Sequence, residues 1–233
     1  MGSSSSGHAH HAMHLVLAVQ GSLRVRTGAR GAWARCAGVL TAPDVAHAID
    51  ARERETLLVF LDPESEVGRT LRASVEGPLR LIEAEERDAL VDVDPRVLMG
   101  PEGPRWTSLI ARTLGAGSAR ARRPVHPRVR VVLRHLATVG RDDDVSLEAL
   151  ADVADLSPGR FMHAFTESIV IPLRSYLAWL RLQRAASAIV GCAQLAEAEL
   201  SAGFSDAAHM SRTFRAMLGM TPSSLREAAL DRA

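Results

Sequence analysis

The chain has no long apolar run, and this excludes a membrane-embedded protein. Of its 233 residues, 47% are hydrophobic, but they do not form the run of about eighteen consecutive apolar residues that a membrane-spanning helix needs. The first residues, Met1 to Gly7, are polar and lack the apolar stretch and cleavage site of a secretory signal. They could be native or the remnant of a purification tag. We therefore expect a cytoplasmic protein with no membrane partner.

Cysteine is scarce and lysine is absent. The two cysteines, Cys36 and Cys192, lie far apart and lack the CxxC spacing of metal and redox motifs, as expected in a reducing compartment. We interpret both as small buried hydrophobic residues. Every cationic side chain is arginine, which reflects coding bias or suits bidentate contacts to guanine and phosphate.

The amino-terminal half begins with strand patterns and continues with helix patterns. Short apolar or alternating runs at Met13–Val19, Ser22–Thr27 and Thr56–Leu61 predict strands, with glycines between them. After Pro63 the period changes: Val67, Leu71 and Val75 share one helical face. Further short helices are predicted at 85–91 and 106–114.

A segment of small and charged residues without apolar period follows these helices. Residues 116–124 are predicted to be an interdomain linker, with an exposed helix end as the alternative. The expected organisation is a domain over residues 1–115, this linker, and a helical domain over residues 125–233. An amphipathic helix over 127–139 opens the second domain.

The last ninety residues contain one helix–turn–helix pattern twice, and this repeat carries the functional prediction. The copies span Ser146–Tyr176 and Gln194–Leu225, with turns at 155–157 and 203–205. A long apolar helix over 174–189 joins them and should fix their separation at roughly 34 Å, one helical turn of DNA. Two copies at nearly constant spacing predict paired DNA readers.

In each copy the second helix should bury one face and present the other to a major groove. Phe161 and Phe165 define the buried face in the first copy, and Met210 and Phe214 define it in the second. Ser157 and Ser205 are the expected N-caps. The residues left to face DNA are Gly159, Arg160, Met162, His163, Ala208, His209, Ser211, Arg212 and Arg215.

These predicted DNA contacts have structural alternatives. Arg160 and Arg212 could pair with guanine, or Arg160 could instead pair with Asp155. Arg215 is either a phosphate contact or a solvated charge. Residues 124–233 hold twelve arginines against twelve acidic residues, so we expect only modest salt-dependent non-specific binding.

The stretch from Val145 to Glu227, about a third of the chain, resembles the DNA-binding domain of the AraC/XylS family of transcription regulators. That resemblance implies two helix–turn–helix units on one connecting helix, and hence promoter DNA as a partner, with RNA polymerase as a second partner if the protein activates. The chain departs from the family pattern at Ala198 and Glu199, and at Ile169, where the family has glycine. The residues that carry the resemblance are Leu156-Ser157-Pro158, Phe165, Arg181-Leu182, Ala185, Ala202 to Asp206, Ser211-Arg212, Phe214 and Gly219 to Pro222.

Regulatory domains of this family are often small cupin-like β-barrels, which agrees with the predicted strands, so the expected fold class is α+β. His8, His10, His14 and Gly21 resemble the first cupin motif in spacing, with His14 where that motif has Glu, and His47 falls in a shortened second motif. Four imidazoles would suit Zn²⁺, Cu²⁺, Ni²⁺ or Fe²⁺ better than Mg²⁺ or Ca²⁺. His11 should point away, since neighbours alternate along a strand.

Other interpretations of these histidines remain open. They could be hydrogen-bonded core residues of a metal-free cupin, or a degraded purification tag, although Ala9, Ala12 and the fit to Gly21 argue against a tag. An effector pocket inside the barrel would be lined by residues that could equally be plain core. These are Leu15, Leu17, Leu23 and Val25, with Trp33 at its mouth.

The sequence thus predicts a DNA-binding transcription regulator whose cupin-like domain senses a metal or small ligand, and not an enzyme. The helix at 106–114 is a candidate homodimer face. The alternatives are a metal-dependent cupin enzyme with an accessory helical domain, and a DNA-binding protein whose barrel serves only dimerisation. The enzyme is disfavoured because the amino-terminal segment has no visible acid–base partner, and because a fold does not establish chemistry.

Overall fold

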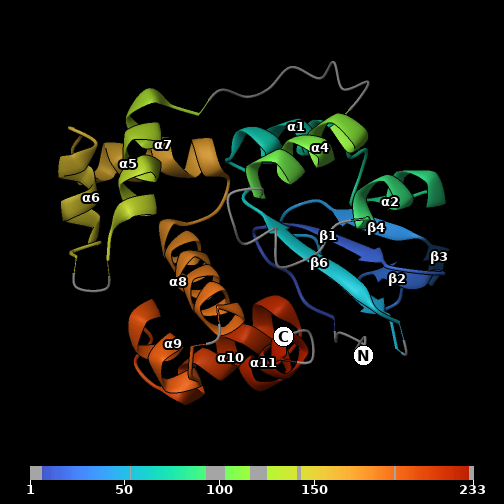
Figure 1. Cartoon of the computed structure of the whole chain (residues 1–233). Helices are drawn as coiled ribbons and strands as arrows, with labels where there is room; N and C mark the ends of the chain where they lie inside the picture. Colours follow the sequence, from blue (N-terminus) through green and yellow to red (C-terminus); the bar gives the residue numbers. More distant parts are fainter. Residues whose placement is uncertain are drawn as a thin grey trace. The chain divides into compact units, whose positions relative to one another are not determined.

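The computed structural model describes residues 7–52, 54–92, 103–115, 125–140, 143–191 and 193–230 (Figure 1). It contains two compact units, one mainly of residues up to Arg122 and the other mainly of residues from Arg123 onward. The predicted linker at 116–124 and Cys192 lie outside the described residues, so the exact domain bounds stay a prediction. No helix in the described ranges is long and apolar enough to cross a membrane.

The strands described in the amino-terminal unit are all antiparallel and form two sheets. One sheet has the order β6-β1-β4-β7 and the other β3-β2-β5, and the described strands do not close into the expected cupin barrel. The bounds are β1 (Met13–Ala18), β2 (Leu23–Thr27), β3 (Ala34–Cys36), β4 (Gly38–Thr41), β5 (His47–Asp50), β6 (Thr56–Leu61) and β7 (Leu79–Ile82).

Strand β1 is buried along its whole length because each of its faces packs against a different layer. Leu15 and Leu17 belong to a core shared with helices, whereas Val16 packs in a second core with Leu23 and Val25 of β2. Alternation along a strand produces this division. The four leucine and valine side chains therefore belong to two separate cores, which agrees with the plain-core alternative and not with one shared effector pocket.

Among the described residues, three helices pack on one face of the four-stranded sheet. They are α1 (Glu66–Ser74), α2 (Ala84–Val91) and α4 (Gly103–Gly115) (Figure 1). Trp106, Ile110 and Leu114 of α4 are buried in this core, and the Trp106 indole donates a 3.1 Å hydrogen bond to the Leu90 carbonyl. The apolar face of α4 is thus used inside its own unit. That apolar face is not free for a partner, and homodimer formation itself stays a prediction.

All described elements of the carboxy-terminal unit are helical. They are α5 (Pro127–Thr138), α6 (Leu147–Val153), α7 (Pro158–Ile169), α8 (Leu173–Val190), α9 (Leu195–Ala202), α10 (Ala207–Leu218) and α11 (Pro222–Leu230). The 18 residues of α8 span about 27 Å at 1.5 Å per residue. Its buried stripe includes Tyr176, Trp179 and Leu182, whereas Leu177 and Leu180 are only half-buried.

The exit from α7 is conformationally strained. Val170, the residue after the helix, has φ of +72° and is 66% exposed, while Ile169 is buried, so the unusual position lies one residue later than predicted. A β-branched side chain is disfavoured in this left-handed region. The matching position after α10 is Gly219, with φ of +67°. The first copy therefore has a strained backbone at Val170, whereas glycine makes the same conformation unstrained in the second copy.

Candidate functional site

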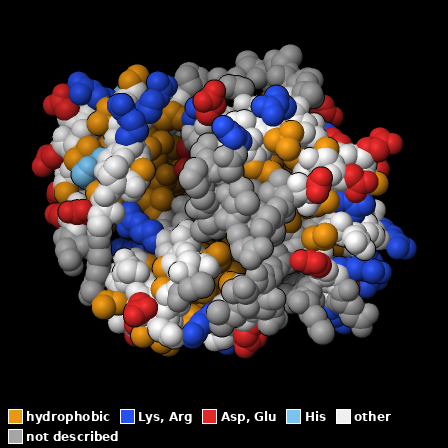
Figure 2. All heavy atoms as spheres, in the orientation of Figure 1, with side chains coloured by type: hydrophobic (Ala, Val, Ile, Leu, Met, Phe, Trp, Pro, Cys, Tyr) orange, Lys and Arg blue, Asp and Glu red, His pale blue; other side chains and the backbone are white. Residues whose placement is uncertain are grey.

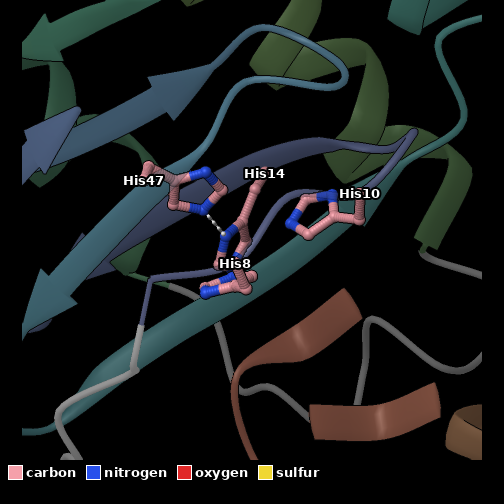
Figure 3. Close-up of side chains that lie close together, drawn as sticks. All are labelled: His8, His10, His14 and His47. Carbon is pink, nitrogen blue, oxygen red and sulfur yellow. Dashed lines mark hydrogen bonds between the residues drawn. The ribbon is translucent and has the colours of Figure 1, made fainter. Parts of the chain in front are cut away.

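Four histidines from separate segments meet in the amino-terminal unit (Figure 3). His8 and His10 precede β1, His14 lies in β1, and His47 begins β5. Reciprocal backbone hydrogen bonds between His8 and His47, of 3.0 and 2.9 Å, hold the first segment against β5. One ring nitrogen from each histidine lies within 4.8 Å of the others, and all four side chains are buried. The structure thus brings together the four residues predicted from spacing.

The position of this four-histidine cluster follows from strand alternation. His14 lies on the same face of β1 as Val16, which packs in the core between the two sheets. His47 belongs to the three-stranded sheet, whereas β1 belongs to the four-stranded sheet. A metal ion bound to the cluster would therefore join both sheets and the segment before β1.

Backbone carbonyls fix the tautomers of two of the rings. His47 Nδ1 donates to the Val45 carbonyl at 2.8 Å, and His10 Nδ1 donates to the Ala12 carbonyl at 3.0 Å. Because a carbonyl only accepts, Nδ1 carries the proton and Nε2 keeps its lone pair, the arrangement typical of metal-binding histidines. His47 Nε2 lies 3.2 Å from His14 Nδ1. Two nitrogens bound tetrahedrally at Zn–N distances of about 2.0–2.1 Å would be about 3.3 Å apart.

Burial keeps the imidazoles of His10, His14 and His47 neutral. It lowers the pKa of His10 to about 3 and that of His47 to about 4, with further lowering by neighbouring histidines. The pKa of His14 also falls well below its ordinary value for the same reasons. Neutral imidazole is the form that binds a metal, so at neutral pH these rings need not lose a proton before a metal binds. The cluster contains no carboxylate, which favours Zn²⁺, Cu²⁺, Ni²⁺ or Fe²⁺ over Mg²⁺ and Ca²⁺.

The residues paired with His14 on either side were not predicted. Phe60 of β6 stacks on the His14 ring with centroids 4.5 Å apart, and Thr41 of β4 is fully buried opposite His14 on the other side. Strand register places both beside His14. No local pattern near Thr41 or Phe60 could have identified them.

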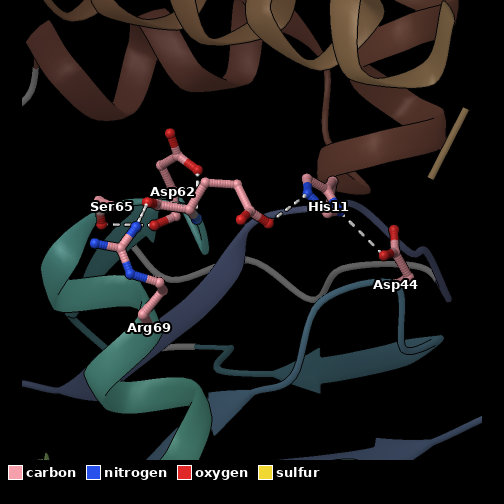
Figure 4. Close-up of polar contacts among 6 residues, drawn as sticks. His11, Asp44, Asp62, Ser65 and Arg69 are labelled. Carbon is pink, nitrogen blue, oxygen red and sulfur yellow. Dashed lines mark hydrogen bonds and ion pairs between the residues drawn. The ribbon is translucent and has the colours of Figure 1, made fainter. Parts of the chain in front are cut away.

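His11 is not part of the cluster, as predicted, and its ring instead meets two carboxylates (Figure 4). Its Nδ1 lies 3.1 Å from Asp44 and its Nε2 lies 3.6 Å from Glu64. Burial by itself would lower the pKa of His11, but the two carboxylates outweigh it and raise this pKa to about 9. Next to Glu64, Ser65 caps α1 by accepting a 2.9 Å hydrogen bond from the Gly68 amide. His11 therefore ties the histidine segment to the start of α1.

The carboxy-terminal unit contains two equivalent helix pairs, α6–α7 and α9–α10. In the first turn Asp155 has φ of +51° and the Leu156 amide donates to the Ala151 carbonyl. In the second, 48 positions later, Gly203 has φ of +77° and the Phe204 amide donates to the Glu199 carbonyl. The same backbone hydrogen bond closes both turns, so the repeat seen in the sequence is also a repeat of conformation.

The second turn has one residue more than the first. Helix α7 begins at Pro158 and α10 begins at Ala207, an offset of 49 positions. The extra residue is Asp206, which accepts a 2.6 Å hydrogen bond from the His209 amide. The capping role expected of Ser205 therefore belongs to Asp206, because the added residue moves the carboxylate into reach of the amide. Ser157, at the start of α7, makes no side-chain capping bond.

The offset of 49 makes the two predicted DNA-contacting sets equivalent. Gly159, Arg160, Met162 and His163 correspond in order to Ala208, His209, Ser211 and Arg212. None of these eight residues is buried, whereas Phe161, Phe165, Met210 and Phe214 are at most 2% exposed. Each second helix thus has one sealed face and one accessible face.

Local contacts distinguish the polar residues on these accessible faces. Asp155 pairs with Arg128 at 2.9 Å, so it is not the partner of Arg160. His163 is highly exposed and lies 3.9 Å from Glu167. His209 is half-buried, with Nδ1 3.1 Å from the Ser205 hydroxyl. Its ring is therefore held by the turn more firmly than that of His163.

Charges of both signs are interspersed on the molecular face shown in Figure 2. Arginine and acidic side chains both occur on the coloured parts of this view. This agrees with the net charge of +1. DNA affinity in such a protein depends on local placement of arginines more than on overall attraction.

Comparison with known proteins supports an assignment for the second half. Residues 150–228 match a family model described as a helix-turn-helix domain. The structure resembles ToxT from Vibrio cholerae O395 over 97% of this chain and 92% of that one, with 9% identity and a TM-score of 0.61. Wild-type ToxT from strain SCE256, bound to an unsaturated fatty acid, matches over 95% of this chain and 88% of that one, with 11% identity and a TM-score of 0.55.

A shorter match concerns the carboxy-terminal region alone. The C-terminal domain of AraT, a response regulator from Geobacillus stearothermophilus, shares 20% identity over 45% of this chain and 88% of that one, with a TM-score of 0.41. The ToxT likeness establishes the α+β fold of the whole chain. Residues 150–228 thus belong to a helix-turn-helix domain.

Proposed function

We propose that the protein regulates transcription by inserting α7 and α10 into successive major-groove segments of promoter DNA, under the control of a metal ion bound by His8, His10, His14 and His47. The equivalence of the two exposed residue sets, at a constant offset of 49, carries the first part of this proposal. Unrelated bundle helices would have no reason to repeat both the turn hydrogen bond and the pattern of exposed residues.

Arg212 and Arg160 are the strongest candidates for base contacts. Both are exposed: Arg160 lies in the first turn of α7, where a recognition helix approaches the bases, and Arg212 lies midway along α10. His163, the position equivalent to Arg212, is also exposed. Arg215 lies further along α10, where a phosphate contact is expected.

The DNA proposal is tested by selecting preferred sites from random duplexes and then measuring affinities. Arg212→Ala should weaken binding to the selected site by about 5- to 150-fold, as loss of a bidentate base contact does, and should relax the preference at one base pair. Arg215→Ala should weaken all sequences uniformly and reduce the salt slope by about one. Arg134→Ala, an exposed α5 arginine outside the proposed surface, is the charge-matched control. Unchanged specific affinity in Arg212→Ala and His163→Ala proteins would contradict the assignment.

The metal proposal depends on four buried imidazoles with nitrogens close enough to share one ion. The bound metal would supply a cross-link between the two sheets. Metal analysis of protein purified without chelator should find about one transition-metal ion per chain. Metal should raise the melting temperature of the wild type and of His135→Ala, a surface control, but not that of His14→Ala. Equal melting temperatures of chelated and metal-loaded wild type would refute the site.

A small organic effector is the second candidate for the regulatory signal. It is favoured by the fold shared with ToxT, one structure of which holds an unsaturated fatty acid. Titration with fatty acids in the presence and absence of metal separates the two candidates. A ligand that alters DNA affinity equally in the wild type and in His14→Ala acts without the histidine cluster.

A further inference from the structure

A buried hydroxyl group lies beside the four-histidine cluster without a hydrogen-bond partner among the described residues. Thr41 is 0% exposed, and its Oγ1 accepts and donates no hydrogen bond within the described ranges. It stands directly opposite His14 on the neighbouring antiparallel strand. Side chains of directly opposed residues project to the same face of a sheet. The Thr41 hydroxyl is therefore on the side of β4 that faces the cluster.

His14, like Thr41, has a buried polar atom without a hydrogen-bond partner among the described residues. Its Nε2 is buried and without a hydrogen-bond partner in the described part of the chain, although its Nδ1 contacts His47. Nearly all buried polar groups in folded proteins are paired, and those that are not call for a bound ion, water or ligand. The proposed metal would itself occupy a His14 nitrogen, so the Thr41 hydroxyl beside it marks the place for a further small polar species.

The charge of the cluster indicates what that species is. Four neutral imidazoles contribute no negative charge, and the cluster contains no carboxylate. A divalent ion bound there would keep both positive charges in a buried environment, which is unfavourable without a counter-charge. The nearby carboxylates, Asp44 and Glu64, are already paired with His11. A small anion that binds the metal would supply the missing charge.

We propose that the four-histidine metal centre keeps an open coordination position for a small monovalent anion, to which Thr41 donates a hydrogen bond. This inference rests on the proposed metal site and adds to it a ligand class and a specificity residue. Of the two described residues that strand pairing places beside His14, Thr41 and Phe60, only Thr41 carries a hydrogen-bond donor on its side chain. A centre with this design would respond to the anion as well as to the metal.

The test uses azide as the probe and the full chain loaded with Cu²⁺. Azide binding to Cu²⁺ produces a charge-transfer absorption band, so its Kd is measured by titration. The wild type should bind azide, and Thr41→Val should weaken azide roughly tenfold or more, as expected for one hydrogen bond to an anion. Thr41→Ser, which keeps the hydroxyl, should bind within about twofold of the wild type. Copper stoichiometry should be the same in all three proteins.

Four outcomes would overturn the inference. Copper-loaded wild type without an azide band would mean a coordinatively closed centre. Equal azide affinity in Thr41→Val and the wild type would exclude Thr41 as the donor. Lower copper affinity in Thr41→Val with unchanged azide affinity would make Thr41 a positioning residue for His14. If the wild type retains no metal, the proposed metal site itself fails and the inference fails with it. The melting temperature of metal-free Thr41→Val, expected to equal or exceed that of the wild type, verifies folding.

Discussion

Raising the pH above neutrality should destabilise the metal-free protein through a single residue, His11. Its folded pKa of about 9 lies above the ordinary value of 6.5, so the stability it contributes is fully present below pH 6.5 and is lost as the pH rises toward 9. The difference of about 2.5 pH units corresponds to about 3 kcal/mol at 1.36 kcal/mol per unit. Asp44 is about half exposed, so solvent screening reduces this to about 1–3 kcal/mol.

The measurement is urea unfolding of chelator-treated wild type and His11→Gln at pH 6.5, 7.5 and 9. The wild type should lose about 1–3 kcal/mol across this range through His11, and His11→Gln should lack that loss. The acid side is an internal control. As the pH falls from 6.5 to 4, both proteins should lose stability. In the unfolded chain His10 and His47 become protonated in this range, whereas in the folded protein their pKa values of about 3 and 4 keep them neutral. An equal loss of unfolding free energy in the two proteins between pH 6.5 and 9 would refute the role given to His11.

Three further changes test the carboxy-terminal unit by thermal or urea unfolding. Val170→Gly should stabilise by about 1 kcal/mol, because it relieves a left-handed β-branched residue that is 66% exposed and loses little packing; an unchanged or lower Tm would contradict this. Phe214→Ala should cost about 3–5 kcal/mol, since the ring is 0% exposed, and a loss under 1 kcal/mol would show that the site collapses. Asp206→Ala should cost about 0.5–2 kcal/mol by removing the cap of α10, whereas Ser205→Ala should cost less; the reverse order would restore Ser205 as the cap.

Several features were predicted because they depend on residues close together in the sequence. The helices from 127 onward follow apolar periodicity, and the buried pairs Phe161–Phe165 and Met210–Phe214 follow from positions four apart on a helix. The repeat that identifies the DNA-binding domain is likewise local. The strand patterns at Met13–Val19 and Thr56–Leu61 were correct for the same reason. Strands of three or four residues, such as β3 and β7, carry too short a pattern to be detected.

The sequence by itself therefore determined the four histidines as a set, the exposed residues of α7 and α10, and the division into a strand-rich and a helical half. Tertiary structure alone decided that the described strands form two sheets, that α4 buries its apolar face within its own unit, and that Thr41 lies opposite His14. The physical reason is that strand pairing and register join residues far apart in the chain. Spacing along the sequence records which side of a strand a residue occupies, but not which strand stands beside it.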